Sequence, residues 1–309
     1  MLQERDAANA RRRSRPWRDL ALAALFAILP ATAHAAAVDS YYERAVMTAA
    51  NQRCGLFTAN LAAALGAAEA QARGAALRSG LNSATLAQVG QRASDQAART
   101  PCNAPDLAVA ADRVRTAFEG YAKLYQMTFA GDAAAWKADR ATSAAIRRWR
   151  LSQPSKFGWD TMIFGLAGRT EPPALYAVAN FADGALPYAA RLVVRDTGRA
   201  PDPFLNILRA GAGGRLAMAD RTPPRWATRS ILAEARGAIN PQLYPGGTTF
   251  AVGFRFPAWA MDTLAGLDPR EVVAVDFLFA SGSGESVRTA YVEVGDFAAG
   301  RAFLAAGRR

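Results

Sequence analysis

The spacing of the apolar residues changes from a helical to an alternating period near residue 143, and this change limits the chain to a mixed architecture. Between residues 40 and 129, apolar residues recur every three or four positions, whereas later segments alternate between apolar and polar side chains. The first pattern places a stripe along a helix, and the second places one face on a strand. The sequence therefore predicts an α+β fold, with a helical domain and its connection at 36–143 and a β-rich domain at 144–309.

The first 35 residues have the three parts of a secretory signal peptide. Arginines at 11–13, 15 and 18 precede an apolar run over 20–29, and Pro30 and small residues lead to the expected cleavage site between Ala35 and Ala36. Cleavage there predicts a periplasmic or secreted protein without a stable transmembrane anchor. A membrane anchor over 20–38 is the alternative, but the strongly apolar part has about half the length of a spanning helix.

Removal of the leader would remove His34, the single histidine of the chain. Without an imidazole, Ser-His-Asp and Cys-His catalysis and histidine-ligated metals are excluded, so neither a metal nor another cofactor is expected. The cleavage would also remove six arginines and three acidic residues, which lowers the formal charge from +11 to +8. The remaining positive charges are scattered, which disfavours nucleic acid and favours an anionic envelope surface or an unknown envelope protein as partner.

Cys54 and Cys102 are the two cysteines of the chain. An even number in a chain with an export signal predicts one disulfide between them, which would staple the helical hairpin or bundle. Two buried free thiols are the alternative. Metal binding is not expected, because two thiolates without a histidine fill half of a tetrahedral site.

The helical half predicts three helices. Ser40 to Glu43 has the form of a capping box, so the first helix is expected to begin at Ser40, and its apolar stripe continues to Ala72. A second helix is expected over 83–98, and Asn103 is the expected cap of the third. Residues 131–143 are expected to form a fourth helix or the connection to the second domain.

Seven segments of the second half have the alternation of β-strands: 159–164, 175–181, 189–194, 226–233, 248–256, 271–279 and 287–294. Turn residues separate these segments, which predicts an antiparallel, β-sandwich-like domain. Two short helices, over 257–264 and 296–306, are expected among the strands and at the end.

The order of the last elements is strand, helix, strand, turn, strand, helix. The closing motif is Gly295-Asp296-Phe297-Ala298-Ala299. In this order and in the closing helix, residues 249–299 resemble the end of the invasion-associated locus B family of exported β-rich proteins. The resemblance covers about a fifth of the chain and implies an envelope protein without known catalysis.

Two groups of residues are candidates for a functional site. Asp276 and Glu293 lie on consecutive predicted strands, and paired carboxylates can act as acid and base in glycosidic cleavage if burial raises one pKa. A solvated or arginine-paired structural role is the alternative. Tryptophans outside the predicted bundle could form a ligand platform or fill a core or an interface. These are Trp149, Trp159, Trp226 and Trp259.

These observations lead to two hypotheses for function. The first is an exported, non-enzymatic envelope protein that binds a protein or a component of the cell envelope. The second is a histidine-free hydrolase that uses carboxylates to act on envelope glycan.

Overall fold

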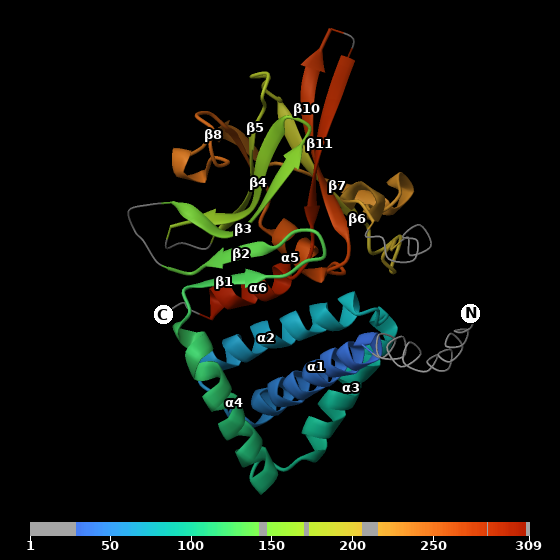
Figure 1. Cartoon of the computed structure of the whole chain (residues 1–309), viewed down its shortest axis with the longest axis vertical. Helices are drawn as coiled ribbons and strands as arrows, with labels where there is room; N and C mark the ends of the chain where they lie inside the picture. Colours follow the sequence, from blue (N-terminus) through green and yellow to red (C-terminus); the bar gives the residue numbers. More distant parts are fainter. Residues whose placement is uncertain (1–28, 142–146, 170–172, 206–215, 283, 307–309) are drawn as a thin grey trace, which may run out of the picture.

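The computed structural model describes the chain except for residues 1–28, 142–146, 170–172, 206–215, 283 and 307–309. In the described part, helices come first and antiparallel sheets with two short helices follow, which confirms the predicted α+β class. Figure 1 shows the helices at one end of an elongated molecule and the sheets at the other. The first four helices are α1 (Leu29–Cys54), α2 (Ala59–Arg78), α3 (Ser83–Arg99) and α4 (Pro105–Lys123).

The first helix begins earlier than the capping-box pattern predicts. Ser40 lies inside α1, which already includes Leu29, so the expected start at Ser40 is wrong. Alanine, the strongest helix former, dominates residues 31–37 and extends the helix towards its N-terminus. Pro30 falls in the first turn, where its missing N–H costs no intrahelical hydrogen bond. Ala35 and Ala36, the predicted cleavage residues, are exposed on this helix.

The predicted stripe from Ser40 to Ala72 is divided between two helices. Gly55 has φ of 63°, a left-handed conformation that favours glycine, and its N–H donates to the carbonyl of Asn51 at 2.8 Å. This glycine ends α1, and α2 begins at Ala59. Sequence spacing alone did not reveal the break, because the apolar residues keep a helical spacing across it.

The other two helices agree closely with the prediction. Asn82 caps α3 by accepting a hydrogen bond from the N–H of Thr85 at 2.7 Å. The helix α4 is preceded by Ala104 rather than by the expected cap Asn103, and Pro105 occupies its first turn. The predicted disulfide is present: Cys54 ends α1 and Cys102 lies between α3 and α4, with their Cα atoms 5.6 Å apart.

Two antiparallel sheets form the second half of the molecule. The seven-stranded sheet has the order β1-β2-β3-β4-β5-β9-β8, and the four-stranded sheet has the order β11-β10-β6-β7. The strands are β1 (Gln126–Phe129), β2 (Trp136–Asp139), β3 (Arg148–Phe157), β4 (Asp160–Gly168), β5 (Ala174–Asn180), β6 (Ala189–Arg195), β7 (Thr228–Leu232), β8 (Ala235–Ala238), β9 (Val252–Arg255), β10 (Val272–Ser281) and β11 (Gly284–Glu293). The short helices are η2 (Met218–Arg221), η3 (Arg225–Ala227), η4 (Pro241–Leu243), α5 (Trp259–Gly266) and α6 (Phe297–Ala305).

The strands β1, β2, β3 and β8 are absent from the sequence-based expectation. The segment 136–139, expected to be helix or connection, is strand β2, so a fourth helix over 131–143 is wrong for this part; residues 142–143 lie outside the described residues. Both β1 and β2 precede the expected boundary at residue 144 and still pair within the seven-stranded sheet. Pro154 is tolerated in β3 because the pairing of β3 with β2 extends over Leu151 and Ser152 and leaves Pro154 at an open edge.

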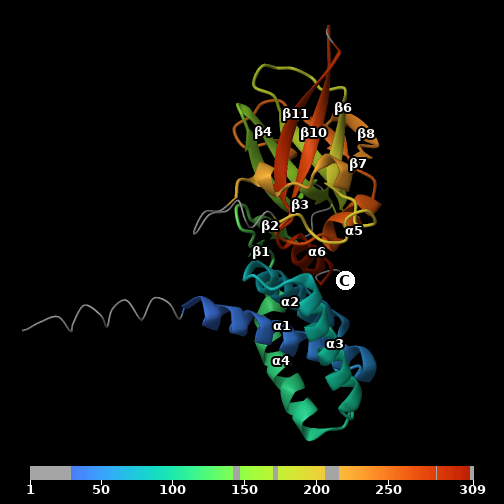
Figure 2. The ribbon, with the colours of Figure 1, turned by 90° about the vertical axis from the view of Figure 1, so that its right-hand side faces the viewer.

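One apolar core joins the facing sides of the two sheets. Phe277 of the four-stranded sheet stacks on Phe157 of the seven-stranded sheet, with ring centroids 5.8 Å apart, and meets Phe181 edge to face at 5.2 Å. These contacts give the sandwich-like arrangement that the alternation predicts. Figure 2 shows the two sheets as layers above the helices.

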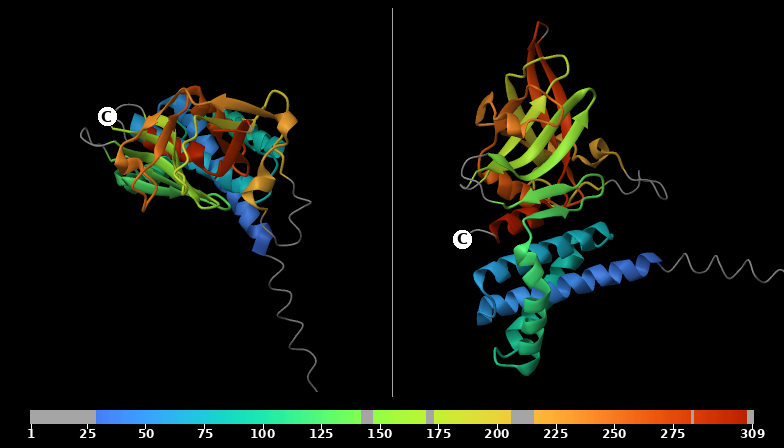
Figure 3. Two further views of the ribbon diagram at one scale, coloured as in Figure 1. Left: turned by 90° about the horizontal axis from the view of Figure 1, so that it is seen from above. Right: turned by 60° about the vertical axis from the view of Figure 1, so that its left-hand side comes forward.

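The helix α6 lies between the sheets and α2 (Figure 3). Its Phe303 packs in the main core, which also includes Ala67 of α2. Phe303 also meets Tyr121 of α4 edge to face, with centroids 5.6 Å apart. The apolar core therefore continues from the sheets into the helical half.

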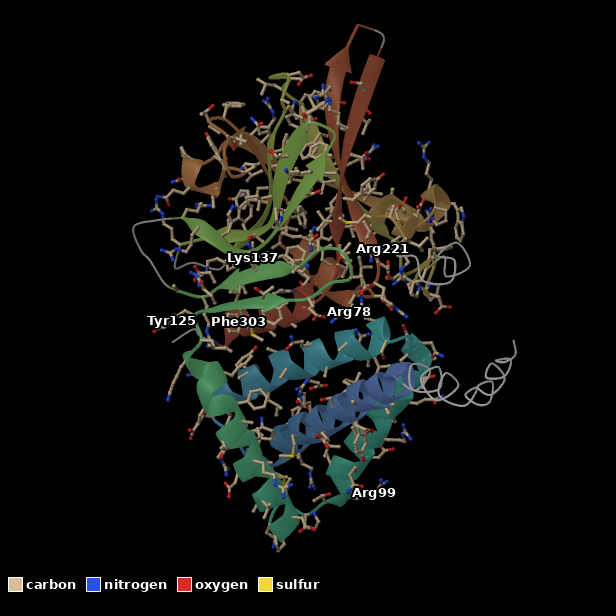
Figure 4. The ribbon with its side chains drawn as sticks, in the orientation of Figure 1. Arg78, Arg99, Tyr125, Lys137, Arg221 and Phe303 are labelled. Carbon is tan, nitrogen blue, oxygen red and sulfur yellow. A yellow bond between two sulfur atoms is a disulfide. The ribbon has the colours of Figure 1, made fainter. Side chains whose placement is uncertain are left out.

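A bidentate ion pair crosses the same interface. The guanidinium of Arg78 on α2 donates to the two carboxylate oxygens of Asp296 at 2.6 and 3.0 Å, and Figure 4 shows Arg78 between the helices and the sheets. Burial raises the pKa of Asp296, and the hydrogen bonds from Arg78 oppose this rise. The pair thus places a buried charge where α2 meets the β half.

Gly74 on α2 makes this close approach possible, and its replacement is a test of the interface. A Cβ at residue 74 would lie 2.1 Å from Oδ1 of Asp296, so Gly74→Ala is expected to lower the free energy of unfolding by about 1–3 kcal/mol. Gly66 on the same helix has open space around it, so Gly66→Ala is expected to be neutral or stabilising. Urea unfolding of both variants measures the difference, and equal stability would contradict this account of the interface.

Candidate functional site

Trp159 lies at the tip of the β3–β4 hairpin. Phe157 pairs with Asp160, so Gly158 and Trp159 form a two-residue turn, in which Gly158 has φ of 63°. The side chain of Trp159 is 92% exposed, whereas Trp136 is buried in the main core. The turn therefore holds a large aromatic ring in solvent, where it contributes little to the core.

A hollow of about 810 Å³ lies beside this ring, and we call it the Trp159 pocket. It forms where the open edge of β3 meets β11, the edge strand of the other sheet, and the hydroxyl of Ser155 donates to the carbonyl of Tyr291 at 2.9 Å between them. The polar and aromatic side chains that line it are Lys156, Phe157, Trp159, Asp160, Asp183, Arg288, Thr289 and Tyr291. Its size is in the range of pockets that hold small ligands.

Arg288 is held in place from several sides. Its guanidinium donates to Asp160 at 3.2 Å and to Asp183 at 3.1 Å, and its Cζ lies 4.7 Å from the ring centroid of Phe279. Asp160 is fixed in turn, since it accepts a hydrogen bond from the N–H of Ala182 at 2.9 Å. The arginine and its two carboxylates therefore form a preorganised polar wall.

The contacts between Arg288 and Asp183 favour the charged forms of both side chains. The hydrogen bonds from Arg288 lower the pKa of Asp183 to about 2, and the N–H of Ala185 acts in the same direction. The same hydrogen bond raises the pKa of Arg288. Asp183 is thus ionised at neutral pH, so it can accept hydrogen bonds from a ligand, and it has no proton to give as a general acid.

The register of β10 and β11 does not bring Asp276 and Glu293 together. Glu293 is opposite Val272, and Asp276 is opposite Thr289. The two acidic residues share a face but are offset by four residues, about 13 Å along the strands. Asp276 accepts hydrogen bonds from Nε of Arg191 at 3.0 Å and from the hydroxyl of Thr289 at 2.7 Å.

Glu293 is fully buried, and its carboxylate organises the loop between β1 and β2. Its two oxygens accept hydrogen bonds from the backbone N–H groups of Asp132, Ala133 and Ala134, each at 2.7 Å. Nη1 of Arg221 donates to the same carboxylate at 2.8 Å. The carboxylate of Glu293 therefore accepts hydrogen bonds from four donors. This is the structural, arginine-paired role that the sequence analysis left open as the alternative to catalysis.

The backbone of Glu293 continues this network into β3. Its N–H donates to the side-chain oxygen of Gln153 at 2.8 Å, and its carbonyl accepts from the side-chain nitrogen at 3.1 Å. The indole N–H of Trp136 donates to the carbonyl of Val294 at 2.9 Å. Glu293 therefore ties β11 to the strands β2 and β3 of the other sheet.

The four tryptophans named as a platform do not gather in one place. Trp159 lines the Trp159 pocket, and the other three do not. Trp149 donates its N–H to the carbonyl of Leu243 at 3.1 Å, so it fills a structural position. Trp226 is 62% exposed against Phe204, and Trp259 is 51% exposed beneath the guanidinium of Arg229.

Sequence reasoning identified one residue of this pocket and missed the others. Trp159 was a candidate, but Lys156, Asp183 and Arg288 are all 27 or more positions apart in the sequence and meet only through the arrangement of β3, β5 and β11. Asp183 precedes Gly184, and this Asp-Gly pair, which is typical of a turn, was the one local sequence feature that indicated the position of Asp183. Among the described residues, no group of three or more His, Cys, Asp or Glu side chains could hold a metal ion.

No family model matches the chain, and neither a curated protein nor a solved structure is significantly similar to it. The resemblance of residues 249–299 to the invasion-associated locus B family therefore stays a prediction. Within the described residues, no helix has the length and apolar character needed to cross a membrane.

Proposed function

We propose that the chain is an exported, non-enzymatic binding protein of the cell envelope, and that the Trp159 pocket binds a saccharide unit of an envelope glycan. The leader pattern over 1–35 supports export, with cleavage between Ala35 and Ala36. The Cys54–Cys102 disulfide supports it as well, because such bonds persist in oxidising compartments.

The exposed ring of Trp159 carries the binding part of this proposal. A tryptophan that is 92% exposed beside a hollow has a face free for a ligand. A sugar ring has an apolar C–H face and a rim of hydroxyls, so it suits an aromatic ring next to fixed hydrogen-bonding groups. Asp183 offers an ionised acceptor, and Lys156 and Arg288 offer donors.

The carboxylate hydrolase has no comparable support. Asp276 and Glu293 are offset along their strands, whereas the carboxyls of glycosidases lie about 5–10 Å apart. Each of them also has an arginine partner, Arg191 and Arg221 respectively. We therefore favour binding without cleavage.

The test compares two exposed tryptophans. Trp159→Ala is expected to weaken binding of soluble peptidoglycan glycan strands by about twofold to twelvefold, because aromatic stacking is worth about 0.5–1.5 kcal/mol beyond area burial. Its stability is expected to stay within about 0.5 kcal/mol of the original, since the ring is exposed. Trp226→Ala, which lies outside the pocket, is the matched control and is expected to bind normally. Calorimetric titration measures the affinities.

Three results would contradict the proposal. They are the absence of glycan binding, equal loss in both tryptophan variants, and release of cleaved glycan that depends on Asp276 or Glu293. Export is tested separately. The intact mass of protein isolated from the periplasm is expected to correspond to a chain that begins at Ala36.

A further inference from the structure

A second hollow, of about 780 Å³, lies in the helical half between α1, α2 and α4, and we call it the helical groove. In the right-hand view of Figure 3, α4 runs across α1 and α2. One end of α4 is held by Leu107 and Ala111, which are buried with Met47 and Leu65. The other end is held by Tyr121, which packs on Phe303 of α6. The groove opens beside the segment between these two attachments.

The lining of the groove is mainly apolar. Flexible and small side chains dominate it, and methionines adapt readily to the shape of a bound chain. The apolar residues that line it are Val46, Met47, Leu65, Ala68, Ala110, Val114, Ala117, Phe118 and Met127. Such a surface favours burial of hydrocarbon.

The polar groups of the groove are mostly cationic or neutral donors. Arg44 is half-buried and donates to the carbonyl of Ala68 at 3.1 Å, while Arg113 is exposed, and Glu43 is the acidic residue of the lining. The hydroxyl of Tyr121 is buried and has no hydrogen-bond partner among the described residues. Burial raises the pKa of Tyr121 to about 12, so this hydroxyl keeps its proton.

From this combination we infer that the helical groove binds the acyl chain of an anionic amphiphile, with the anionic head near Arg44 and Arg113. The size of the groove distinguishes this ligand from a docked helix. A helix is about 10–12 Å wide with its side chains, so the groove would hold only about two turns of one. The volume lies instead in the range of about 300–1,000 Å³ that is usual for small-molecule pockets.

The inference is independent of the Trp159 pocket and is tested with dodecanoate and with dodecanol, its uncharged analogue. Both are expected to displace dansyl-undecanoate from the helical groove of the protein isolated from the periplasm. The fluorescence of this probe reports how much of the groove it occupies. Dodecanoate is expected to bind more tightly than dodecanol by about twofold to fivefold, the range of partly exposed ion pairs. Arg44→Gln with Arg113→Gln is expected to remove this difference, and Arg99→Gln, on α3 outside the groove, is expected to keep it.

The position of the chain is tested by filling the groove. Ala117→Trp places an indole in it and is expected to weaken binding of both probes about tenfold or more, the loss from displacing about two methylenes. Ala108→Trp is the matched control, since Ala108 is exposed on the same helix and does not line the groove. Thermal unfolding confirms that both variants fold. Trp159→Ala is expected to leave the binding of both probes unchanged.

Several outcomes would overturn the inference. They are failure of dodecanoate to bind, equal binding by the two tryptophan variants, and equal affinity for the charged and uncharged probes. A concentration-dependent dimer that Ala117→Trp dissociates would also overturn it, because the groove would then belong to an interface with a second copy of the chain. Sedimentation of the unliganded protein distinguishes that case.

Discussion

Glu293→Ala is expected to lower the free energy of unfolding by about 3–5 kcal/mol, the usual cost of removing one partner from a buried ion pair. The substitution leaves the guanidinium of Arg221 without its carboxylate in a buried position. It also removes the acceptor of three backbone N–H groups, in Asp132, Ala133 and Ala134. Urea unfolding followed by fluorescence measures the change.

The control for this variant lies on the same strand. Glu285 is exposed near the other end of β11, where it accepts a hydrogen bond from the hydroxyl of Tyr188. Glu285→Ala is expected to change stability by no more than about 0.5 kcal/mol. If both variants lost the same stability, the buried carboxylate would not have the role that its contacts indicate.

A double-mutant cycle separates the ion pair from the amide contacts. Glu293→Gln and Arg221→Met are each expected to destabilise the protein, and the double variant is expected to recover about 1 kcal/mol or more of the summed loss. Strictly additive effects would show that Arg221 and Glu293 contribute separately.

Loss of the disulfide is expected to have an effect of similar size. Cys54→Ala with Cys102→Ala opens a loop whose ends are 48 residues apart, and the chain-entropy model gives a loss of about 4 kcal/mol for such a loop. The core beneath the bond is small and consists of three alanines with Met47, Leu65 and Leu107, so it has little apolar area to offset this loss.

The effect should appear first in the helical half. In the double variant, the helical circular dichroism signal is expected to be lost at a lower urea concentration than the one at which the tryptophan fluorescence, which includes that of the buried Trp136, changes. Reductant is expected to reproduce the shift in the original protein and to have no effect on the double variant. An unchanged midpoint after complete reduction would contradict a stabilising role of the bond.

Local sequence signals predicted the helical half well where a local residue decides the structure. The extent of α3 was predicted to within one residue, and the pairing of Cys54 with Cys102 followed from cysteine number and compartment, whereas the cap of α4 is Ala104 instead of the expected Asn103. The start of α1 and the break at Gly55 were missed. In both places the apolar spacing is continuous, and the decisive factors are alanine content and a single left-handed glycine.

The strands β1 to β3 were missed for a different reason. β3 carries three charged residues and Pro154, and β1 has only four residues, so neither has the alternation of a long strand. Their pairing partners, and not their own sequences, make them strands. The sequence left an arginine-paired role open for Glu293, but its other partners could not be predicted, because three of its four donors are backbone amides of a distant loop.

The helix α6 follows every strand in chain order, and yet it fills the space between α2 and the sheets. Asp296, which precedes it, provides the carboxylate for Arg78 on α2. The two halves consequently cannot lock together before the residues of α6 are available to fold. Until α6 has folded, the apolar surface around Ala67 of α2 lacks the side chains of α6 that cover it in the complete structure.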